Sequence, residues 1–276
     1  MAKCSFCGEP AGFLRKKHKE CQAKHDNGWS RMLDVAADSV VGKAPRERLE
    51  SRLRDIAACS YIPSSRIRDA MVRGWEKAVD HFLDDGDLDE TEESQLSEFA
   101  SLFSLSQEDL DSKGSYSRMV KGAILRDVLK GMIPERLRVQ GDLLFNFQKA
   151  EKLIWLFPDV AYYEDRKRRE YVGGHHGVSL RVAKGVYYRV GAFKGRPVET
   201  TETVAVGSGP MAVTNKHIYF AGGGKSFRIR HDKIVTIHPY ADGVGVQRDA
   251  QTAKPQLFIT GDGWFTYNLL MNVSNL

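Results

Sequence analysis

The sequence predicts a multidomain α+β protein: a small zinc-binding module, a bundle of helices, and a β-rich region that ends in a helix. Three observations lead to this prediction. Three of the four cysteines lie within the first 21 residues, helical periodicity follows to about residue 130, and after residue 173 short apolar segments alternate with turns. We therefore expect domains over residues 1–28, 29–132 and 133–276.

The composition is that of an ordinary globular protein and excludes several other classes. The 276 residues are 42% hydrophobic and 28% charged, and the net charge of +5 is below the excess of cations that marks a dedicated nucleic-acid binder. No apolar segment approaches the roughly 18 residues of a membrane span, and the cysteines are not spread as in a secreted disulfide scaffold. We therefore expect a cytoplasmic protein in a reducing compartment.

The N-terminal segment has the spacing of a zinc site. Cys4 and Cys7 are separated by two residues, and Gly8 relieves the tight turn that brings both thiolates to one ion. His18 and Cys21 are three residues apart, so they share one face of a helix. Four protein ligands close the coordination sphere, so we expect a structural Zn²⁺, and the pattern resembles the CCHC class of small zinc fingers.

Two questions about this module stay open. His25 lies four residues after Cys21 on the same helix face and is an alternative to His18 as the fourth ligand. A run of cations also lies beside the site. It consists of Arg15, Lys16, Lys17 and Lys19. Such a run predicts either phosphate contacts with a nucleic acid or a solvated helix face.

Between residues 29 and 130 the apolar residues recur at helical spacing, which predicts four or five short helices packed as a bundle. Pro45 is expected at the first position of the second helix, and the apolar stripe of the third runs from 67 to 82. Asp89, with Glu92 three residues later, predicts a capping box at the start of the next helix.

The acidic stretch Asp84–Glu93 raises the question of a second metal site. In the register of a calcium-binding EF-hand loop, Glu90 stands where glycine is required and Leu96 where the final glutamate is required, so that motif is excluded. The segment 81–105, with an Asp-Gly turn and an acid-capped helix, resembles the tellurite-resistance-B-like helical domain. That resemblance implies divalent-metal binding at acidic residues, here Asp85, Asp87 and Asp89. The alternative is that these acids stabilise the positive end of the following helix.

The C-terminal half predicts short antiparallel strands, and we expect the β region to begin between Leu137 and Phe147. Alternating apolar residues between 178 and 190 predict a hairpin with a three-residue turn, Ala183-Lys184-Gly185. That turn pairs Arg181 with Tyr187 and Ser179 with Arg189. Later strands are expected at 203–206, 211–214, 217–220, 226–230, 233–238, 243–247 and 256–259, and a final helix at 264–273.

The segments Gly209–Phe220, Lys225–Arg230 and Lys233–Ile237 resemble the core of a GRAM or bacterial PH-like domain. The resemblance covers roughly residues 173–275. It implies a partly open β-barrel, capped by the last helix, that binds lipid headgroups or peptides and is not catalytic. It also implies that the predicted hairpin carries an anion- or partner-binding rim. The residues of that rim are Arg181, Lys184, Tyr187, Arg189, Lys194 and Arg196.

No sequence motif for catalysis is present: there is no P-loop, no nucleophile elbow and no His-Glu-x-x-His zinc motif. We therefore expect a non-enzymatic, zinc-containing adaptor that binds another protein or an anionic partner. Two alternatives stay open. The basic run of the finger favours a nucleic-acid-binding regulatory or defence protein, and the basic hairpin favours peripheral binding to an anionic membrane lipid.

Overall fold

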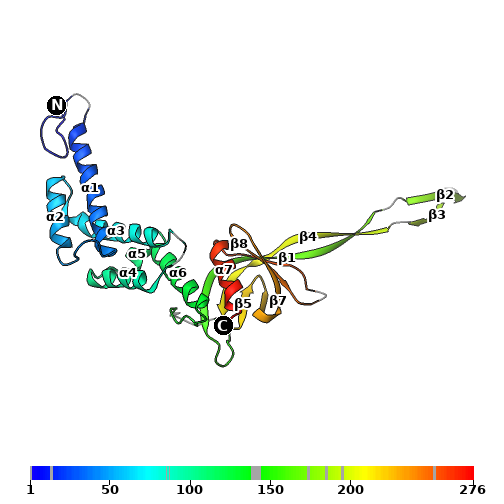
Figure 1. Cartoon of the computed structure of the whole chain (residues 1–276). Helices are drawn as coiled ribbons and strands as arrows, with labels where there is room; N and C mark the ends of the chain where they lie inside the picture. Colours follow the sequence, from blue (N-terminus) through cyan, green and yellow to red (C-terminus); the bar gives the residue numbers. More distant parts are fainter. Residues whose placement is uncertain are drawn as a thin grey trace. The chain divides into compact units, whose positions relative to one another are not determined.

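The computed structural model describes residues 2–12, 15–84, 86, 88–137, 144–172, 175–183, 186–193, 196–250 and 253–276, with the backbone alone described between 166 and 202. The chain divides into two compact units, Met1–Met132 and Ile133–Leu276. The first unit is helical and the second contains the strands, so the protein belongs to the predicted α+β class (Figure 1).

The described part of the first unit contains six α-helices, whereas the periodicity predicted four or five. They are α1 (Lys19–Val40), α2 (Leu49–Cys59), α3 (Ile67–Phe82), α4 (Glu90–Leu102), α5 (Gln107–Asp111) and α6 (Ser115–Leu129), with the short 3₁₀ helix η1 (Ser64–Arg66) before α3. The prediction of Pro45 as the first residue of a helix is wrong, because α2 begins at Leu49. Between the helices, Arg46 donates hydrogen bonds to the carbonyl oxygens of Ser39 and Val40, which fixes an irregular connection.

The core of the first unit forms where α1 packs against α3. A Cβ at Gly74 of α3 would lie 2.3 Å from the Cβ of Ala36 in α1, so glycine is what lets the two helices approach this closely. Beside it, Trp75 is fully buried and its indole N–H donates to the carbonyl oxygen of Leu96 over 3.0 Å. Burial of an indole of this size stabilises the unit by about 3 kcal/mol.

Helix α4 begins at the predicted capping box. The Asp89 carboxylate accepts a hydrogen bond from the Glu92 backbone N–H at 2.7 Å, and the Glu92 carboxylate accepts one from the Asp89 N–H at 3.0 Å. The prediction is confirmed, and the Asp89 side chain is thereby engaged by the helix terminus.

The second unit contains a seven-stranded antiparallel sheet and a separate two-stranded sheet. The strands are β1 (Leu153–Val172), β2 (His175–Ala183), β3 (Val186–Phe193), β4 (Arg196–Thr214), β5 (His217–Gly222), β6 (Lys225–Arg230), β7 (Ile234–Pro239), β8 (Gly243–Arg248) and β9 (Gln256–Ile259). The large sheet has the order β6-β5-β4-β1-β9-β8-β7. On one side of β1 lie β4, β5 and β6 in that order. On the other side lie β9, β8 and β7, so the last strand of the chain pairs with the first. Over the described residues the sheet is therefore open, with β6 and β7 as its edges.

Strands β1 and β4 are longer than any strand that the sequence predicted. Their register runs from Leu153 opposite Thr214 to Val172 opposite Arg196, whereas β9 pairs with β1 only over the residues 161–164. Beyond that point β1 and β4 continue as a two-stranded ribbon that leads to β2 and β3. The strands predicted at 203–206 and 211–214 are two parts of β4.

The predicted pairing of the hairpin is confirmed, but its turn is wrong. Strands β2 and β3 pair Arg181 with Tyr187 and Ser179 with Arg189. Ala183 belongs to β2 and pairs with Val186, after a register shift that begins at Arg181. Val182 is the extra residue of this bulge, so Ala183, which the sequence assigned to the turn, is a paired strand residue. Lys184 and Gly185 lie outside the described residues.

In the described part of Leu137–Phe147, where we predicted the start of the β region, no strand is present. Residues 144–150 form no strand, and 138–143 lie outside the described residues. The backbone N–H of Gln148 donates to the Glu151 carboxylate at 2.8 Å, which turns the chain immediately before β1.

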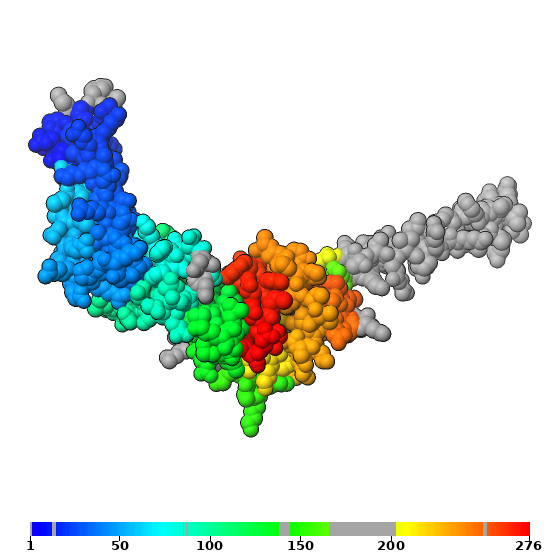
Figure 2. Space-filling model, in the orientation of Figure 1, coloured from blue at the N-terminus to red at the C-terminus, as the bar shows by residue number. Residues whose placement is uncertain are grey.

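The predicted final helix is present as α7 (Gly263–Val273), which packs against β7 and β8 (red against orange in Figure 2). Its Phe265 ring lies 5.1 Å from the ring of Trp155 and 6.2 Å from that of Phe157, both in β1. A second aromatic cluster brings together rings from β1, β5, β6 and β9. Its members are Tyr162, Phe220, Phe227 and Phe258. Aromatic packing on the sheet therefore forms the core of the second unit.

Candidate metal centre

The four residues predicted to hold zinc converge in the structure. One ligand atom from each of Cys4, Cys7, His18 and Cys21 lies within 4.8 Å of the corresponding atoms of the other three. Cys4 is buried and the other three are half-buried. Among the described residues this is the cluster of cysteine, histidine and acidic side chains with the geometry for a metal ion.

A tight turn presents the first two sulfurs. The N–H of Gly8 donates to the carbonyl oxygen of Cys4 at 2.9 Å, and Gly8 has a φ of +79°, a conformation that glycine adopts without strain. The N–H of Cys4 donates to the carbonyl oxygen of Glu9 at 2.7 Å. These bonds fold residues 4–9 back on themselves, so Cys4 and Cys7 face the same point.

The other two ligands come from the start of α1. His18 is the N-cap residue of α1, and Cys21 lies in the first turn, as the three-residue spacing predicted. His18 Nδ1 lies 3.3 Å from the sulfur of Cys7 and 3.7 Å from that of Cys21. The other ring nitrogen, Nε2, lies 3.0 Å from the carbonyl oxygen of Pro10. Because a carbonyl oxygen only accepts, Nε2 carries the proton and the Nδ1 lone pair is free for a metal.

The thiols have pKa values shifted in opposite directions. Burial raises the pKa of Cys4, but hydrogen bonds from the backbone N–H groups of Cys7, His18 and Phe6 outweigh it and lower the pKa to about 6. Burial, together with hydrogen bonds and charge from Cys7 and Cys4, raises the pKa of Cys21 to about 11. Without a cation the three sulfurs are therefore not all thiolates at neutral pH. A divalent cation favours the thiolate at every ligand.

Tyr61 is a residue of this site that the sequence analysis missed. It follows α2, has a φ of +56°, and stacks on Phe6 with ring centroids 5.9 Å apart. Its pKa is raised, mainly by negative charge at Cys21 and further by burial and by charge at Cys7. The Lys24 ammonium lies 5.2 Å from the centre of the Tyr61 ring. Tyr61 thus joins the metal-binding module to the end of α2. No local spacing pattern points to it, because its partners lie far away in the sequence.

His25, the alternative ligand, lies outside the cluster. Its ring stacks on Phe6 with centroids 4.9 Å apart, and its Nδ1 lies 3.0 Å from the carboxylate of Asp26. The structure therefore selects His18 of the two candidates.

The four cations beside the centre are exposed. They are Arg15, Lys16, Lys17 and Lys19. The Lys17 ammonium lies 4.6 Å from the centre of the Phe6 ring and donates to the side-chain oxygen of Gln22 at 3.1 Å. None of these interactions involves a carboxylate, so the positive charge of Lys17 is not neutralised by them.

The other predicted site residues are described only in part. Asp85 and Asp87 lie outside the described residues, as do Lys184 and Lys194 of the hairpin rim. For the remaining rim residues the structure gives backbone pairing alone: Arg181 with Tyr187, Ser179 with Arg189, and Val172 with Arg196. A metal site in the acidic stretch and a binding rim on the hairpin therefore stay predictions.

Comparisons of the chain with protein-family models, with curated proteins and with solved structures found no match. Within the described residues, no helix combines the length and the apolar character needed to cross a bilayer.

Proposed function

We propose that this protein is a non-enzymatic recognition protein whose N-terminal module is ordered by a structural zinc ion. The observation that carries the proposal is the convergence of three sulfurs and one ring nitrogen within 4.8 Å of one another. Ligands of a tetrahedral zinc ion lie about 3.8 Å apart when both are sulfur, and slightly closer when one is nitrogen. The separations of 3.3 and 3.7 Å between His18 Nδ1 and two of the sulfurs agree with that geometry.

The donor set favours zinc and a structural role. Three thiolates and one imidazole are soft and borderline donors, which suit Zn²⁺ better than Mg²⁺ or Ca²⁺. Four protein ligands leave no open position for a substrate or a reactive water. When bound, zinc cross-links the turn of Cys4 and Cys7 to the first turn of α1. The hydrogen bond from His18 to Pro10 holds the imidazole in the tautomer that binds metal.

We further propose that the second unit is a PH-like recognition domain, and that the whole chain is an adaptor. The strand order supports this, since two meanders meet where β9 lies beside β1 and a helix follows the last strand. The same proposal assigns no enzymatic activity to the chain. Turnover in an activity screen with nucleotides and nucleic acids would contradict it.

A second candidate function is nucleic-acid binding by the N-terminal module. The four exposed cations beside the metal centre favour it, since such side chains contact phosphates. Binding to a DNA or RNA duplex at low salt, weakened by Lys16→Gln with Lys19→Gln, would support this function. The absence of binding to either duplex at low salt would remove it.

The proposal is tested by metal analysis of the full chain purified without chelators. We expect elemental mass spectrometry to find about one zinc per chain. We also expect the Co²⁺-substituted protein to show the charge-transfer absorption of thiolate ligands. Cys21→Ser is expected to lose the zinc. Cys59→Ser is the matched control, because Cys59 is an exposed cysteine outside the cluster, and it is expected to keep the zinc. Wild-type protein without stoichiometric zinc would overturn the proposal.

A further inference from the structure

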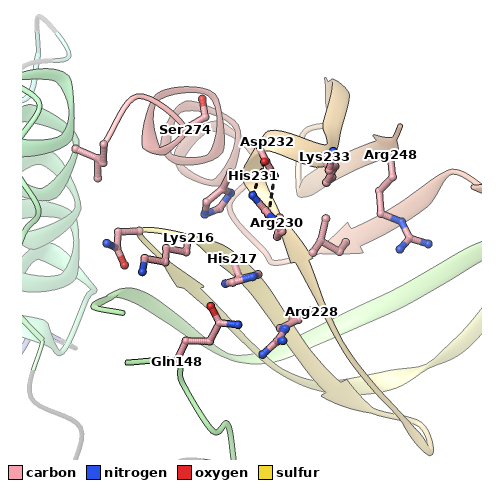
Figure 3. Close-up of a pocket in the computed structure, with 13 residues that line it drawn as sticks. Gln148, Lys216, His217, Arg228, Arg230, His231, Asp232, Lys233, Arg248 and Ser274 are labelled. Carbon is pink, nitrogen blue, oxygen red and sulfur yellow. Dashed lines mark hydrogen bonds and ion pairs between the residues drawn. The ribbon is translucent and has the colours of Figure 1, made fainter. Parts of the chain in front are cut away.

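One cavity of the second unit is lined by cations. It has a volume of about 790 Å³ and lies where the β4–β5 turn, the end of β6, the 3₁₀ helix η2 (His231–Lys233) and the end of β8 come together. Five basic side chains line it: Lys216, Arg228, Arg230, Lys233 and Arg248 (Figure 3). Asp232 is the acidic side chain among the described lining residues.

That one carboxylate is already neutralised by one of the five cations. Arg230 binds Asp232 through two hydrogen bonds of 2.6 and 3.0 Å, drawn as dashed lines in Figure 3. Lys216, Arg228, Lys233 and Arg248 form no ion pair within the described part of the chain. Four uncompensated cations around one cavity repel each other, and an anion of matching charge removes that repulsion.

Two buried nitrogen atoms at this cavity also have no hydrogen-bond partner among the described residues. They are Nε of Arg248 and Nδ1 of His231. His231 is only 7% exposed, and its Nε2 lies 2.8 Å from the carbonyl oxygen of Thr214, so Nε2 donates and Nδ1 is left as an acceptor. Unpartnered buried polar atoms are rare in folded proteins and indicate a missing partner. A phosphate group offers both an acceptor for Arg248 and, when it carries a proton, a donor for His231.

One lining residue of the cavity, His217, is held in place by a buried carboxylate. Its Nδ1 lies 2.9 Å from the Glu151 carboxylate. That carboxylate also accepts hydrogen bonds from the hydroxyls of Thr214 and Tyr219. These contacts engage the Glu151 carboxylate with Thr214, His217 and Tyr219. The arrangement is therefore preorganised for an anion.

We propose that this cavity binds a small ligand with several phosphate groups, through Lys216, Arg228, Lys233 and Arg248. The volume is far larger than one inorganic phosphate requires and falls in the usual range for small-molecule sites. Arginine suits phosphate because its planar guanidinium donates two parallel hydrogen bonds. The ligand is either a soluble polyphosphorylated molecule or the headgroup of a phosphorylated lipid.

This site is separate from the predicted hairpin rim and from the metal centre. The β4–β5 turn lies at the Leu153–Thr214 end of the β1–β4 pair, whereas the hairpin extends from the Val172–Arg196 end. The inference does not depend on zinc binding, and all its residues lie in the second unit.

Calorimetric titration of the full chain tests the proposal, with inorganic tripolyphosphate as the soluble probe. We expect saturable binding that weakens as salt is raised, and a loss of about tenfold in affinity for each of Lys233→Gln and Arg228→Gln. Lys254→Gln is the matched control, because Lys254 is an exposed lysine of the same unit outside the cavity. It is expected to leave the affinity unchanged. Thermal unfolding of each variant shows that the unit remains folded.

Flotation with phosphatidylcholine vesicles, with or without phosphatidylinositol 4,5-bisphosphate, distinguishes the two sources of phosphate. Binding of either probe that Lys233→Gln and Arg228→Gln weaken supports the site, and the probe that binds more tightly identifies the source. No binding of either probe, or binding that the two variants leave unchanged, would overturn the proposal. Binding of a DNA or RNA strand through these residues without binding of tripolyphosphate or vesicles would overturn it as well.

Discussion

The N-terminal module and the sheet of the second unit differ in what holds them in place. Among the described residues from 2 to 12, only Cys4 and Ala11 are buried, so this segment has almost no apolar core. In the sheet, by contrast, the rings of Tyr162, Phe220 and Phe258 are fully buried against one another. A segment with so little apolar burial needs another source of order, which the proposed zinc ion would supply, whereas aromatic packing holds the sheet together.

Removal of the metal is expected to have the largest effect and to separate the two regions. Structural zinc contributes on the order of 10 kcal/mol of binding energy to small domains, and we expect the proposed zinc ion to order the N-terminal module in the same way. After dialysis against a chelator, backbone amides of this module are expected to exchange hydrogen rapidly, while those of β1, β4 and β5 stay protected. Hydrogen exchange measured peptide by peptide checks this. Equal protection of the N-terminal module with and without metal would show that the metal does not order it.

A large-to-small substitution in the aromatic core is expected to destabilise the second unit and to leave the metal-binding module unaffected. Phe220→Ala removes a fully buried ring and should destabilise the second unit by about 4 kcal/mol, with the zinc content unchanged. Denaturant unfolding and metal analysis on the same sample measure both. Val235→Ala serves as the control, because Val235 is 62% exposed and its truncation should change stability little. Loss of zinc from Phe220→Ala would show that the two regions are coupled.

Acid is expected to weaken the second unit through Glu151. Burial alone would raise the pKa of this carboxyl, but hydrogen bonds from Thr214, Gln148, Tyr219 and His217 lower it to about 2. A carboxyl with a depressed pKa stabilises the fold above its unfolded value of 4.5, and this stability is lost as pH falls from there toward 2. The difference corresponds to about 3 kcal/mol.

Denaturant unfolding between pH 2 and pH 7 checks this prediction. Glu151→Gln should be less stable at pH 7 and should show a smaller change with pH than the wild type. A wild type and a variant with parallel pH profiles would contradict the assignment of this stability to Glu151.

The smallest expected effect concerns the contact that Tyr61 makes between the metal-binding module and the end of α2. Tyr61→Ala removes the ring that stacks on Phe6 and should cost about 1 kcal/mol, seen as weaker zinc retention in competition with a chromogenic chelator. Tyr61→Phe keeps the ring and should lose less. An Ala variant that retains zinc as well as the wild type would show that the metal-binding module holds its metal without help from α2.

Features that depend on neighbouring residues could be predicted from the sequence. The ligands Cys4, Cys7, His18 and Cys21 lie within one short segment, so their spacing alone predicts the cluster. The strands from β5 to β9 are short and bounded by turn residues, and each lies within two residues of its predicted bounds. The final helix and the Asp89 capping box are local patterns as well.

Features that bring distant residues together could not be predicted from the sequence. Tyr61 meets the metal-binding module from the end of α2, and no spacing relates it to Cys21. The cavity proposed to bind phosphate takes its cations from four separate elements, from Lys216 to Arg248, so no run of basic residues in the sequence indicates it. Nor does the sequence show that β1 and β4 continue as a ribbon beyond the large sheet.

The position of β9 has a consequence for the order of events during synthesis. Ala161 of β1 pairs with Ile259 of β9, about a hundred residues later in the chain. The central strand of the large sheet therefore lacks one neighbour until the residues of β9 have left the ribosome, and closing so long a loop is slow. The helical unit ends at Met132 and has no such requirement, so it is able to fold while the sheet is still being made.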